Sequence, residues 1–552
     1  MKRYYLLVIF ILSLICLPSS ALASGIAITG FGPSKLDTTN KTVEFKATML
    51  WQNSWRNDTS YDALWCFLKV QGDDGTERTL KMAHSGINPP GFGPALDAEM
   101  VLDFDVIVPE DKVGFFVIPG SSGVIDDGTS NVTNLAFLWD YSSDAIAYEK
   151  IEAVSENLVF KLYAIEMTYV PEGAFTFGGG YGSGTQRPAQ AYFKSYRSSA
   201  TINTLSYAGG CQVTNGDSFV IGDPLAEITT LSYCTSNTNP STQDYYSLGA
   251  SYPKGYKAFY LMKYEISQGQ YRDFLNSIGS VGTVHCGAGA TTGAYCYSAL
   301  TTTAVSRQYL KHSSAGTWGC DADSDGILNE SNDGEWVAMN NLAWRDLAAY
   351  LDWAGLRPTT EMEFEKAARG THVFPVTSYT DFAWGNSTSM LPFTSVLSSG
   401  TANEKGNQGN AVFSKSYPLR SGSFLGGSRE ESGAGMYGNY DLSGNVAEMV
   451  VTAKNPSAFF SGTNFAGSHG DGVLSSGNAT NTDWPGYGPK TGEVTSASSD
   501  RTGFRGGSYL ENYNYLCVSD RSQIYSSTSL RLSTHGGRGA RSAPVFANTG
   551  KF

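Results

Sequence analysis

Residues 343–370 constrain the fold more than any other part of the chain, because they carry the signals of two consecutive helices. The first has apolar side chains every three or four residues, which would lie on one helix face: Trp344, Leu347, Ala348 and Leu351. The second would begin after Pro358, with Thr359 or Thr360 at its entrance, and would stop at Gly370. The sequence therefore predicts two consecutive helices in this segment.

The composition favours a domain rich in loops. The chain of 552 residues has 62 glycines, 13% aromatic residues and only 16% charged residues, which is not typical of a helical bundle. Its net charge of −13 at pH 7 disfavours nucleic acids and anionic membrane surfaces as partners. Beyond the N-terminus, no segment reaches the roughly 18 apolar residues of a membrane span. We therefore expect no nucleic-acid partner and no membrane span.

The N-terminus has the pattern of a secretory signal peptide. Lys2 and Arg3 precede an apolar stretch over residues 4–17, and small residues at 21–23 precede Ser24. The sequence therefore predicts a signal peptide over residues 1–23 and a secreted protein, located outside the cell, at the cell surface or in the periplasm. Such a location permits disulfides and provides calcium.

Six motifs follow one another in an order that matches a known family. They are MTYVPEGAF (167–175), YEISQGQYRDF (264–274), the two-helix segment (343–370), AWGN (383–386), YDLSGNVAE (440–448) and FRGGSY (504–509). In the second motif, Ser267 would be the N-cap of a helix with Tyr271 and Phe274 on one face. Each motif is weak alone, but the ordered set resembles the formylglycine-generating enzymes, or sulfatase-modifying factors. The resemblance implies an α+β chain whose residues 166–552 adopt a modified C-type-lectin-like fold with long loops.

The resemblance also shows what is missing. In that family, two cysteines after the RGGS motif bind copper and carry out the oxidation, and here the two positions fall on Glu511 and Leu516. Cys517 is the only nearby thiol, and one displaced thiol does not replace a site of two soft thiolate ligands. The expected protein is a divergent member without copper and without the family's catalytic residues.

Calcium is the expected cofactor, and the resemblance implies one site for it. The family holds calcium through four positions that correspond here to Asp441, Gly444, Val446 and Glu448. Oxygen ligands are retained at both side-chain positions, which suits calcium. The alternative is a tight turn at Gly444 and Asn445, with Glu448 solvated or paired with an arginine.

A second calcium loop is predicted from residue spacing alone. Side-chain oxygens would come from Asp321, Asp323, Asp325 and Asn329, with the backbone carbonyl of Ile327 between them. Gly326 stands where such loops turn, but the twelfth position is Asn332 and not a bidentate glutamate. Binding would therefore be weaker, or would recruit Glu330 or Asp333. The alternative is a solvated acidic turn.

Seven cysteines remain after removal of the signal peptide, so at least one is unpaired. Nearest-neighbour spacing predicts the disulfides Cys211–Cys234 and Cys286–Cys296, each closing a Ser/Thr/Gly-rich insertion. Cys66, Cys320 and Cys517 are left unassigned. No CxxC pair or Cys/His cluster indicates zinc.

Residues 24–165 are predicted to form a separate β-sandwich. Short apolar or alternating runs, separated by turn residues, indicate strands at 42–51, 63–70, 99–108, 113–118, 135–141 and 158–165. Four tryptophans in this region could form a carbohydrate platform or simply pack the core: Trp51, Trp55, Trp65 and Trp139.

The C-terminal segment also resembles the variable regions of diversified C-type-lectin-fold proteins. Tyrosine rings and small polar groups suit an adaptable recognition surface. The predicted ligand-binding residues are Asn512, Tyr513, Asn514, Tyr515, Gln523 and Tyr525. The alternative is that they only cap a divergent core. Arg505, Arg521 and Arg541 are expected to stabilise the fold through buried polar pairs.

The sequence thus favours a secreted, non-catalytic binding or structural module for an extracellular protein or glycan ligand. One alternative is a sulfatase-modifying oxidase with a rearranged site, which would convert a substrate cysteine to formylglycine. Another is a self-assembling component of a surface layer or filament. An iron site is disfavoured because the six histidines include no close pair.

Overall fold

The computed structural model describes residues 25–71, 77–94, 104–120, 131–143, 158–177, 194–197, 219–221, 231–235, 244–248, 251–286, 292–297, 304–313, 316–371, 382–385, 390–424, 426–452, 465–495, 501–524 and 526–546. The predicted signal peptide over residues 1–23 lies outside these ranges.

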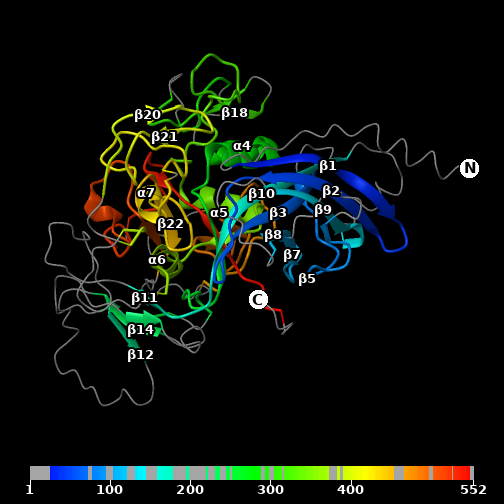
Figure 1. The fold of residues 1–552 in the computed structure, drawn as a ribbon, viewed down its shortest axis with the longest axis horizontal. Coiled ribbons are helices and arrows are strands. Elements are labelled where there is room, and N and C mark those ends of the chain that lie inside the picture. The colour runs from blue at the N-terminus through cyan, green and yellow to red at the C-terminus, as the bar shows by residue number, and fades with distance from the viewer. Residues whose placement is uncertain are drawn as a thin grey trace, which may run out of the picture.

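Two β-sheets contain the described strands of the N-terminal region (Figure 1). The four-stranded sheet has, in spatial order, β1 (Ile26–Asp37), β2 (Thr42–Trp51), β9 (Asn131–Asp140) and β6 (Gly93–Pro94). The larger sheet runs β19 (Arg357–Pro358), β27 (Gly539–Ser542), β16 (Phe259–Met262), β10 (Val159–Val170), β3 (Asp62–Gln71), β8 (Phe115–Pro119), β7 (Phe104–Val108) and β5 (Gly86–Ile87), with β4 (Glu77–Thr79) beside β3. The larger sheet therefore contains strands from both ends of the sequence.

Strand β10 joins the two regions that the sequence separates. Along its length it pairs with β3, from Val159 opposite Gln71 to Thr168 opposite Asp62. Its last four residues also pair with β16 on the other side. The predicted boundary between residues 165 and 166 lies inside this continuous strand.

Both faces of β3 are buried, and each face belongs to a different core. Leu64, Cys66 and Leu68 point into a cluster shared with β1, β2 and β9 of the four-stranded sheet. Trp65 and Phe67 point the other way, into the core that also contains the helices. Because side chains alternate along a strand, β3 separates the two cores while touching both.

Among the described residues, four α-helices contribute to the C-terminal region: α4 (Gln268–Ser277), α5 (Trp344–Trp353), α6 (Glu361–Arg369) and α7 (Arg429–Ser432). The expected starts and stops are found. Ser267 caps α4 and Thr360 caps α6 through side-chain hydrogen bonds to the first turn. Gly370, with φ of 78°, ends α6.

Helix α5 covers the second face of β3. The indole N–H of Trp65 donates to the backbone carbonyl of Ala354, just after α5, at 2.7 Å. Trp353 meets the Phe67 ring edge to face, with ring centroids 5.2 Å apart. The N-terminal strands and the helices therefore share one core.

The remaining elements are short and serve to fix loops. The small sheets are β11 (Phe175–Phe177) with β13 (Phe219–Ile221); β12 (Lys194–Arg197), β14 (Leu231–Thr235) and β15 (Asp244–Leu248); β17 (Leu310–His312) with β18 (Trp318–Cys320); β20 (Val396–Leu397) with β21 (Lys405–Gly406); β25 (Thr502–Arg505), β22 (Ala447–Val451) and β26 (His535–Gly536); and β23 (Tyr487–Gly488) with β24 (Glu493–Val494). The 3₁₀ helices are η1 (Tyr141–Ser143), η2 (Gly279–His285) and η3 (Tyr513–Leu516).

The structure is rich in short strands with few helices, which agrees with the α+β class. The finer assignments, a β-sandwich and a C-type-lectin-like arrangement, stay predictions. The alternative of a tryptophan platform is wrong for three of its four members, because Trp51, Trp65 and Trp139 are buried at 2% exposure or less. Only Trp55 is half-buried.

Candidate functional site

The turn after β25 brings together the positions where the resemblance places the catalytic cysteines. Gly506 and Gly507 have positive φ values, of 85° and 67°. A Cβ on Gly507 would lie 2.8 Å from both the Leu516 side chain and the Tyr515 carbonyl, so only glycine fits this close approach. The RGGS motif thus folds the chain back onto the segment that follows it.

Glu511 occupies the first cysteine position, and its carboxylate is held on both sides. One oxygen accepts from the Ser508 backbone N–H at 2.7 Å, and the other accepts from the Gln523 side chain. Burial raises the pKa of the Glu511 carboxyl. The group is an organised hydrogen-bond acceptor at the position of a family thiol.

Leu516, at the second cysteine position, is fully buried. It packs in a hydrophobic cluster with Val518, Phe364 and Leu442. The neighbouring thiol of Cys517 is buried in the same cluster, and its Sγ lies 3.9 Å from the Tyr513 carbonyl. A hydrocarbon side chain and a sealed thiol do not provide the two adjacent soft ligands that copper needs.

The predicted ligand residues on η3 are brought together by one local cap. The Asn512 side chain accepts from the Asn514 backbone N–H at 3.0 Å and so begins η3. Asn512 is exposed and Asn514 is half-buried, whereas Tyr513 and Tyr515 pack partly against the cluster that holds Leu516. Polar groups therefore face solvent while the two rings rest on the core.

Gln523 joins the same region through its hydrogen bond to Glu511. It is half-buried, and Leu510 beside Glu511 is 62% exposed. Tyr525 lies outside the described residues. The structure thus assembles five of the six predicted ligand residues around η3 and Glu511.

The three arginines expected to stabilise the fold all form ion pairs. Arg505 pairs with Glu365 and lies 3.8 Å from Glu361. Arg521 binds Glu361 with two hydrogen bonds of 2.8 Å, and Arg541 pairs with Asp111. The arginine side chains are buried, so this prediction is confirmed.

The calcium positions implied by the resemblance lie in a buried polar cluster that contains an arginine. Both Glu448 oxygens accept from Arg538, at 2.7 Å each. Asp441 accepts from the Gly422 backbone N–H at 2.6 Å. Both Glu448 oxygens are thus bonded to a guanidinium, which is the arginine pairing that the alternative describes, and calcium at these four positions stays a prediction.

The turn over Gly444 and Val446 is stabilised by a residue that sequence reasoning did not single out. Glu265 accepts from the Val446 backbone N–H at 3.0 Å and from the Asn445 side chain at 2.6 Å. Burial, then the negative charges of Asp441 and Glu448, raise the pKa of Glu265 well above its usual range. The position of Glu265 in the YEIS motif was the sequence signal that could have identified it.

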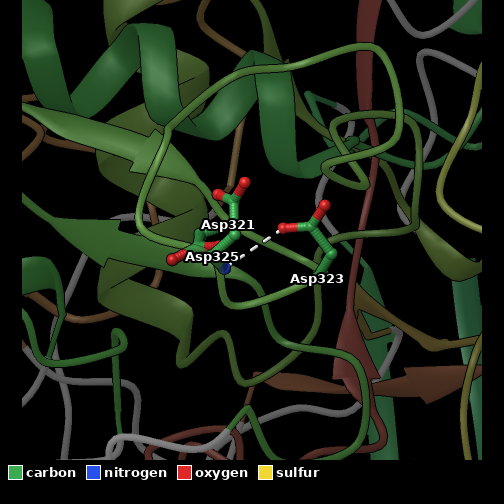
Figure 2. A group of neighbouring side chains, drawn as sticks. All are labelled: Asp321, Asp323 and Asp325. Carbon is green, nitrogen blue, oxygen red and sulfur yellow. Dashed lines mark hydrogen bonds between the residues drawn. The ribbon is translucent and has the colours of Figure 1, made fainter.

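The second predicted calcium loop follows β18. Carboxylate oxygens of Asp321, Asp323 and Asp325 lie within 4.8 Å of one another (Figure 2). Asn329 is turned away, because its side-chain oxygen accepts from the Cys320 backbone N–H and from Arg272. Ile327 is 59% exposed, and its backbone N–H donates to the Asp325 carboxylate at 2.7 Å.

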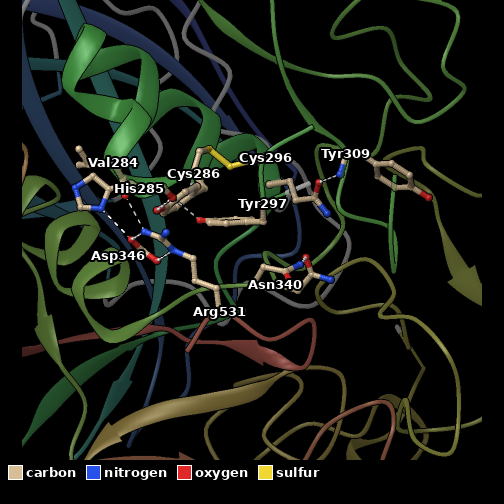
Figure 3. Close-up of a disulfide and its surroundings, with 12 residues drawn as sticks. Val284, His285, Cys286, Cys296, Tyr297, Tyr309, Asn340, Asp346 and Arg531 are labelled. Atoms are coloured by element: carbon tan, nitrogen blue, oxygen red, sulfur yellow. Dashed lines mark hydrogen bonds and ion pairs between the residues drawn. A yellow bond between two sulfur atoms is a disulfide. The ribbon is translucent and has the colours of Figure 1, made fainter. Parts of the chain in front are cut away.

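One predicted disulfide is present, between Cys286 and Cys296, with Cα atoms 4.9 Å apart (Figure 3). Cys211 lies outside the described residues, so the pairing of Cys211 with Cys234 stays a prediction. Cys66 and Cys320 are buried thiols.

A buried ion cluster that sequence reasoning missed lies beside the disulfide (Figure 3). Asp346 accepts two hydrogen bonds from Arg531, each 2.7 Å long, and a third contact of 3.0 Å from His285 Nδ1. His285 Nε2 faces the Gly477 carbonyl at 2.8 Å. Both histidine nitrogens face acceptors, so both contacts are hydrogen bonds only if the ring carries two protons. Both ring nitrogens of His285 are therefore used in contacts within the protein.

Across the described ranges, no helix has the length and apolar character needed to cross a bilayer. No curated protein matches the sequence. The model of the sulfatase-modifying factor enzyme 1-like domain matches residues 236–542, which is more than half of the chain. The chain therefore belongs to the sulfatase-modifying factor family.

Proposed function

We propose that this protein is a secreted, non-catalytic member of its family that acts as a binding or structural module outside the cell. The observation that carries the proposal is the pair Glu511 and Leu516 at the two positions of the family's catalytic cysteines. Glu511 is held by Ser508 and Gln523, and Leu516 is buried. Neither side chain is a soft ligand or a redox group.

The surface around η3 supports a binding role. Asn512 and Asn514 offer amide donors and acceptors, and Tyr513 and Tyr515 offer ring area that is already partly fixed by packing. Rings held in place lose little side-chain entropy when a ligand binds, and small polar groups adapt to its hydrogen bonds. An extracellular protein or glycan is the ligand class that this chemistry suits.

A Cu(I) titration against a competing chelator tests the absence of catalysis. We expect no tight stoichiometric copper binding by the wild-type protein. The variant Glu511→Cys/Leu516→Cys is the matched positive control, because it restores the family's two thiols on the same backbone. Tight wild-type binding that is lost in Cys517→Ser would overturn the proposal and support the alternative of a rearranged oxidase.

The same proteins should be incubated with cysteine peptides and oxygen, with aldehyde formation followed by mass spectrometry. No aldehyde is expected from the wild type, and formation of one would identify an oxidase whatever the copper result. For the binding role, the wild type and Asn512→Ala/Asn514→Ala should be compared on glycan and extracellular-protein arrays. A ligand retained equally by the double variant would place the binding surface elsewhere.

A further inference from the structure

The loop after β18 gathers negative charge that the surrounding protein does not neutralise. Asp321, Asp323 and Asp325 bring carboxylate oxygens within 4.8 Å of one another. Lys311 forms an ion pair with Asp321, with its Nζ 2.5 Å from Oδ2. Among the described residues, Lys311 is the one cation paired with these three carboxylates. Three carboxylates against one ammonium leave two negative charges in a small volume.

A second observation comes from the buried member of the group. Asp321 has no exposed surface, and its Oδ2 accepts from Lys311. Its Oδ1 is buried without a hydrogen-bond partner among the described residues. A buried carboxylate oxygen without a hydrogen-bond donor raises the free energy of the folded state, so a cation or a water bound at this oxygen would stabilise the fold.

A fourth carboxylate lies beside the group. Glu330 follows the loop in the sequence and lies near enough to Asp323 and Asp325 for their negative charges to repel one another. A cation bound between these carboxylates would relieve the repulsion.

Backbone conformation leaves the loop open to an ion on the solvent side. Gly326 has φ of 90°, and nothing lies within 4 Å of the position where its Cβ would be. Asp333, which the sequence offered as a substitute ligand, is already used: its two oxygens accept from the backbone N–H groups of Ala322 and Glu330. Asp333 therefore shapes the loop. Asp323 also accepts two hydrogen bonds, from the Asp325 backbone N–H and the Asn332 side chain, but it is exposed and would exchange these contacts for the ion.

We propose that this loop is a calcium site, with ligands from Asp321, Asp323, Asp325, the Ile327 carbonyl and Glu330. All five ligands are hard oxygens, and flexible exposed carboxylates suit the variable coordination of calcium better than the strict octahedron of magnesium. The ion neutralises the excess charge and supplies the missing partner of Asp321. Asn329 is not a ligand, because its oxygen accepts from Cys320 and Arg272.

The ion would hold two parts of the C-terminal region together. The Tyr295 hydroxyl donates to the Asp321 carbonyl at 2.8 Å, and Tyr295 precedes Cys296 of the disulfide. Arg272 on α4 contacts Asn329 at the far end of the loop. Calcium thus fixes the loop between the disulfide-closed insertion and α4.

Terbium luminescence on the full mature protein tests the site. Tyr295 lies against the loop, so excitation of tyrosine should sensitise terbium bound there, and calcium should displace the terbium. We expect calcium to compete with a dissociation constant of about 10⁻⁵–10⁻³ M and magnesium to compete much more weakly. Wild-type protein without sensitised emission, or with equal competition by magnesium, would overturn the proposal.

Matched variants locate the ion. Asp323 and Asp325 are exposed, so Asp323→Asn and Asp325→Asn should fold normally and weaken calcium binding at least tenfold. Asp58→Asn, an exposed acid in the N-terminal region, is the control and should leave the affinity unchanged. Lys311→Met should tighten binding, since it removes the competing cation. Calcium affinity that is the same in wild type, Asp323→Asn and Asp325→Asn would overturn the assignment.

Discussion

Glu448 and Arg538 form a two-pronged ion pair in the interior, with both carboxylate oxygens 2.7 Å from guanidinium nitrogens. Arg538 also donates to the backbone carbonyls of Met262, Lys263 and Tyr440. One guanidinium thus ties β22, the end of β16 and the segment before β27. Loss of either partner would leave the other buried without its two-pronged pairing.

We predict that Glu448→Gln lowers the free energy of unfolding by about 3–5 kcal/mol, because it removes the negative partner and leaves Arg538 buried. Urea denaturation followed by tryptophan fluorescence measures the change. Glu110→Gln, at an exposed acid, should shift the unfolding free energy by less than about 0.5 kcal/mol. Equal effects of the two substitutions would contradict the role of the pair.

Lys69 predicts an unusual dependence of stability on pH. Its ammonium is fully buried between Phe67 and Trp353, and burial lowers the pKa of Lys69 to about 8, partly offset by Glu77 and Asp352. In the unfolded chain the pKa of a lysine is about 10.4, so between these values the unfolded state binds more protons. The charged form therefore destabilises the fold below pH 8, and this penalty disappears as the pH rises towards 10.4.

The matching experiment compares wild type with Lys69→Met in urea at pH 7, 8.5 and 10. The difference in unfolding free energy between the two proteins should change by about 2.5 kcal/mol over this range. Because both proteins share every other titrating group, their difference isolates Lys69. A constant difference would show that Lys69 titrates normally.

The disulfide Cys286–Cys296 should be essential to the insertion that it closes. Replacing both residues with serine should lower the unfolding free energy by about 2–3 kcal/mol, since a short closed loop restricts the unfolded chain. Peptide mapping with and without reductant checks the pairing directly. Recovery of Cys286 linked to another cysteine would contradict the structure.

We predict that residues 166–552 do not fold alone. Truncation at residue 166 would remove most of β10 and all of β3, including Trp65, whose indole donates to Ala354 and lies over Arg541. Far-UV circular dichroism and thermal unfolding of the fragment would show no cooperative transition. A monomeric fragment that unfolds cooperatively would establish the independent domain that the sequence suggests.

Within the full chain, Trp65→Ala should lower the unfolding free energy by about 3–5 kcal/mol, because it opens a cavity between the two regions. Trp55→Ala is the matched control: this side chain is half-buried, so a smaller loss is expected.

The proposed secretion predicts a specific N-terminus. Protein recovered outside the cytoplasm should begin at Ser24, after cleavage behind the small residues at 21–23. Intact-mass measurement and N-terminal sequencing check this. Protein that retains Met1 in the cell would contradict secretion.

Local signals in the sequence were sufficient for many elements. The caps at Ser267 and Thr360, and the stop at Gly370, define helix ends within one residue because capping is a local hydrogen-bond pattern. Strand β2 spans the expected residues 42–51, with alternate side chains buried. The long strand β1 was missed, since its exposed residues and its glycine and proline obscure the alternation.

The sequence did not predict which distant residues pair with one another. Glu448 matched a family calcium position, but Arg538, 90 residues away, takes both its oxygens. Asn329 had the right spacing for the calcium loop, yet Arg272 turns its side chain outward. Spacing predicts which groups come near one another, whereas their partners depend on tertiary contacts. The positions of Glu511 and Leu516 were readable only because the surrounding motif was present.

Strand β10 has a consequence for how the protein could act between two attachments. A flexible joint between two regions lets the molecules bound to them approach and separate. Here the single strand β10 pairs with β3 of the N-terminal region on one side and with β16 of the C-terminal region on the other. Anything attached to the N-terminal sheets and anything held at η3 would keep a constant separation and orientation. The molecule would then act as a spacer of fixed length, and a force applied at one end would be transmitted directly to the other.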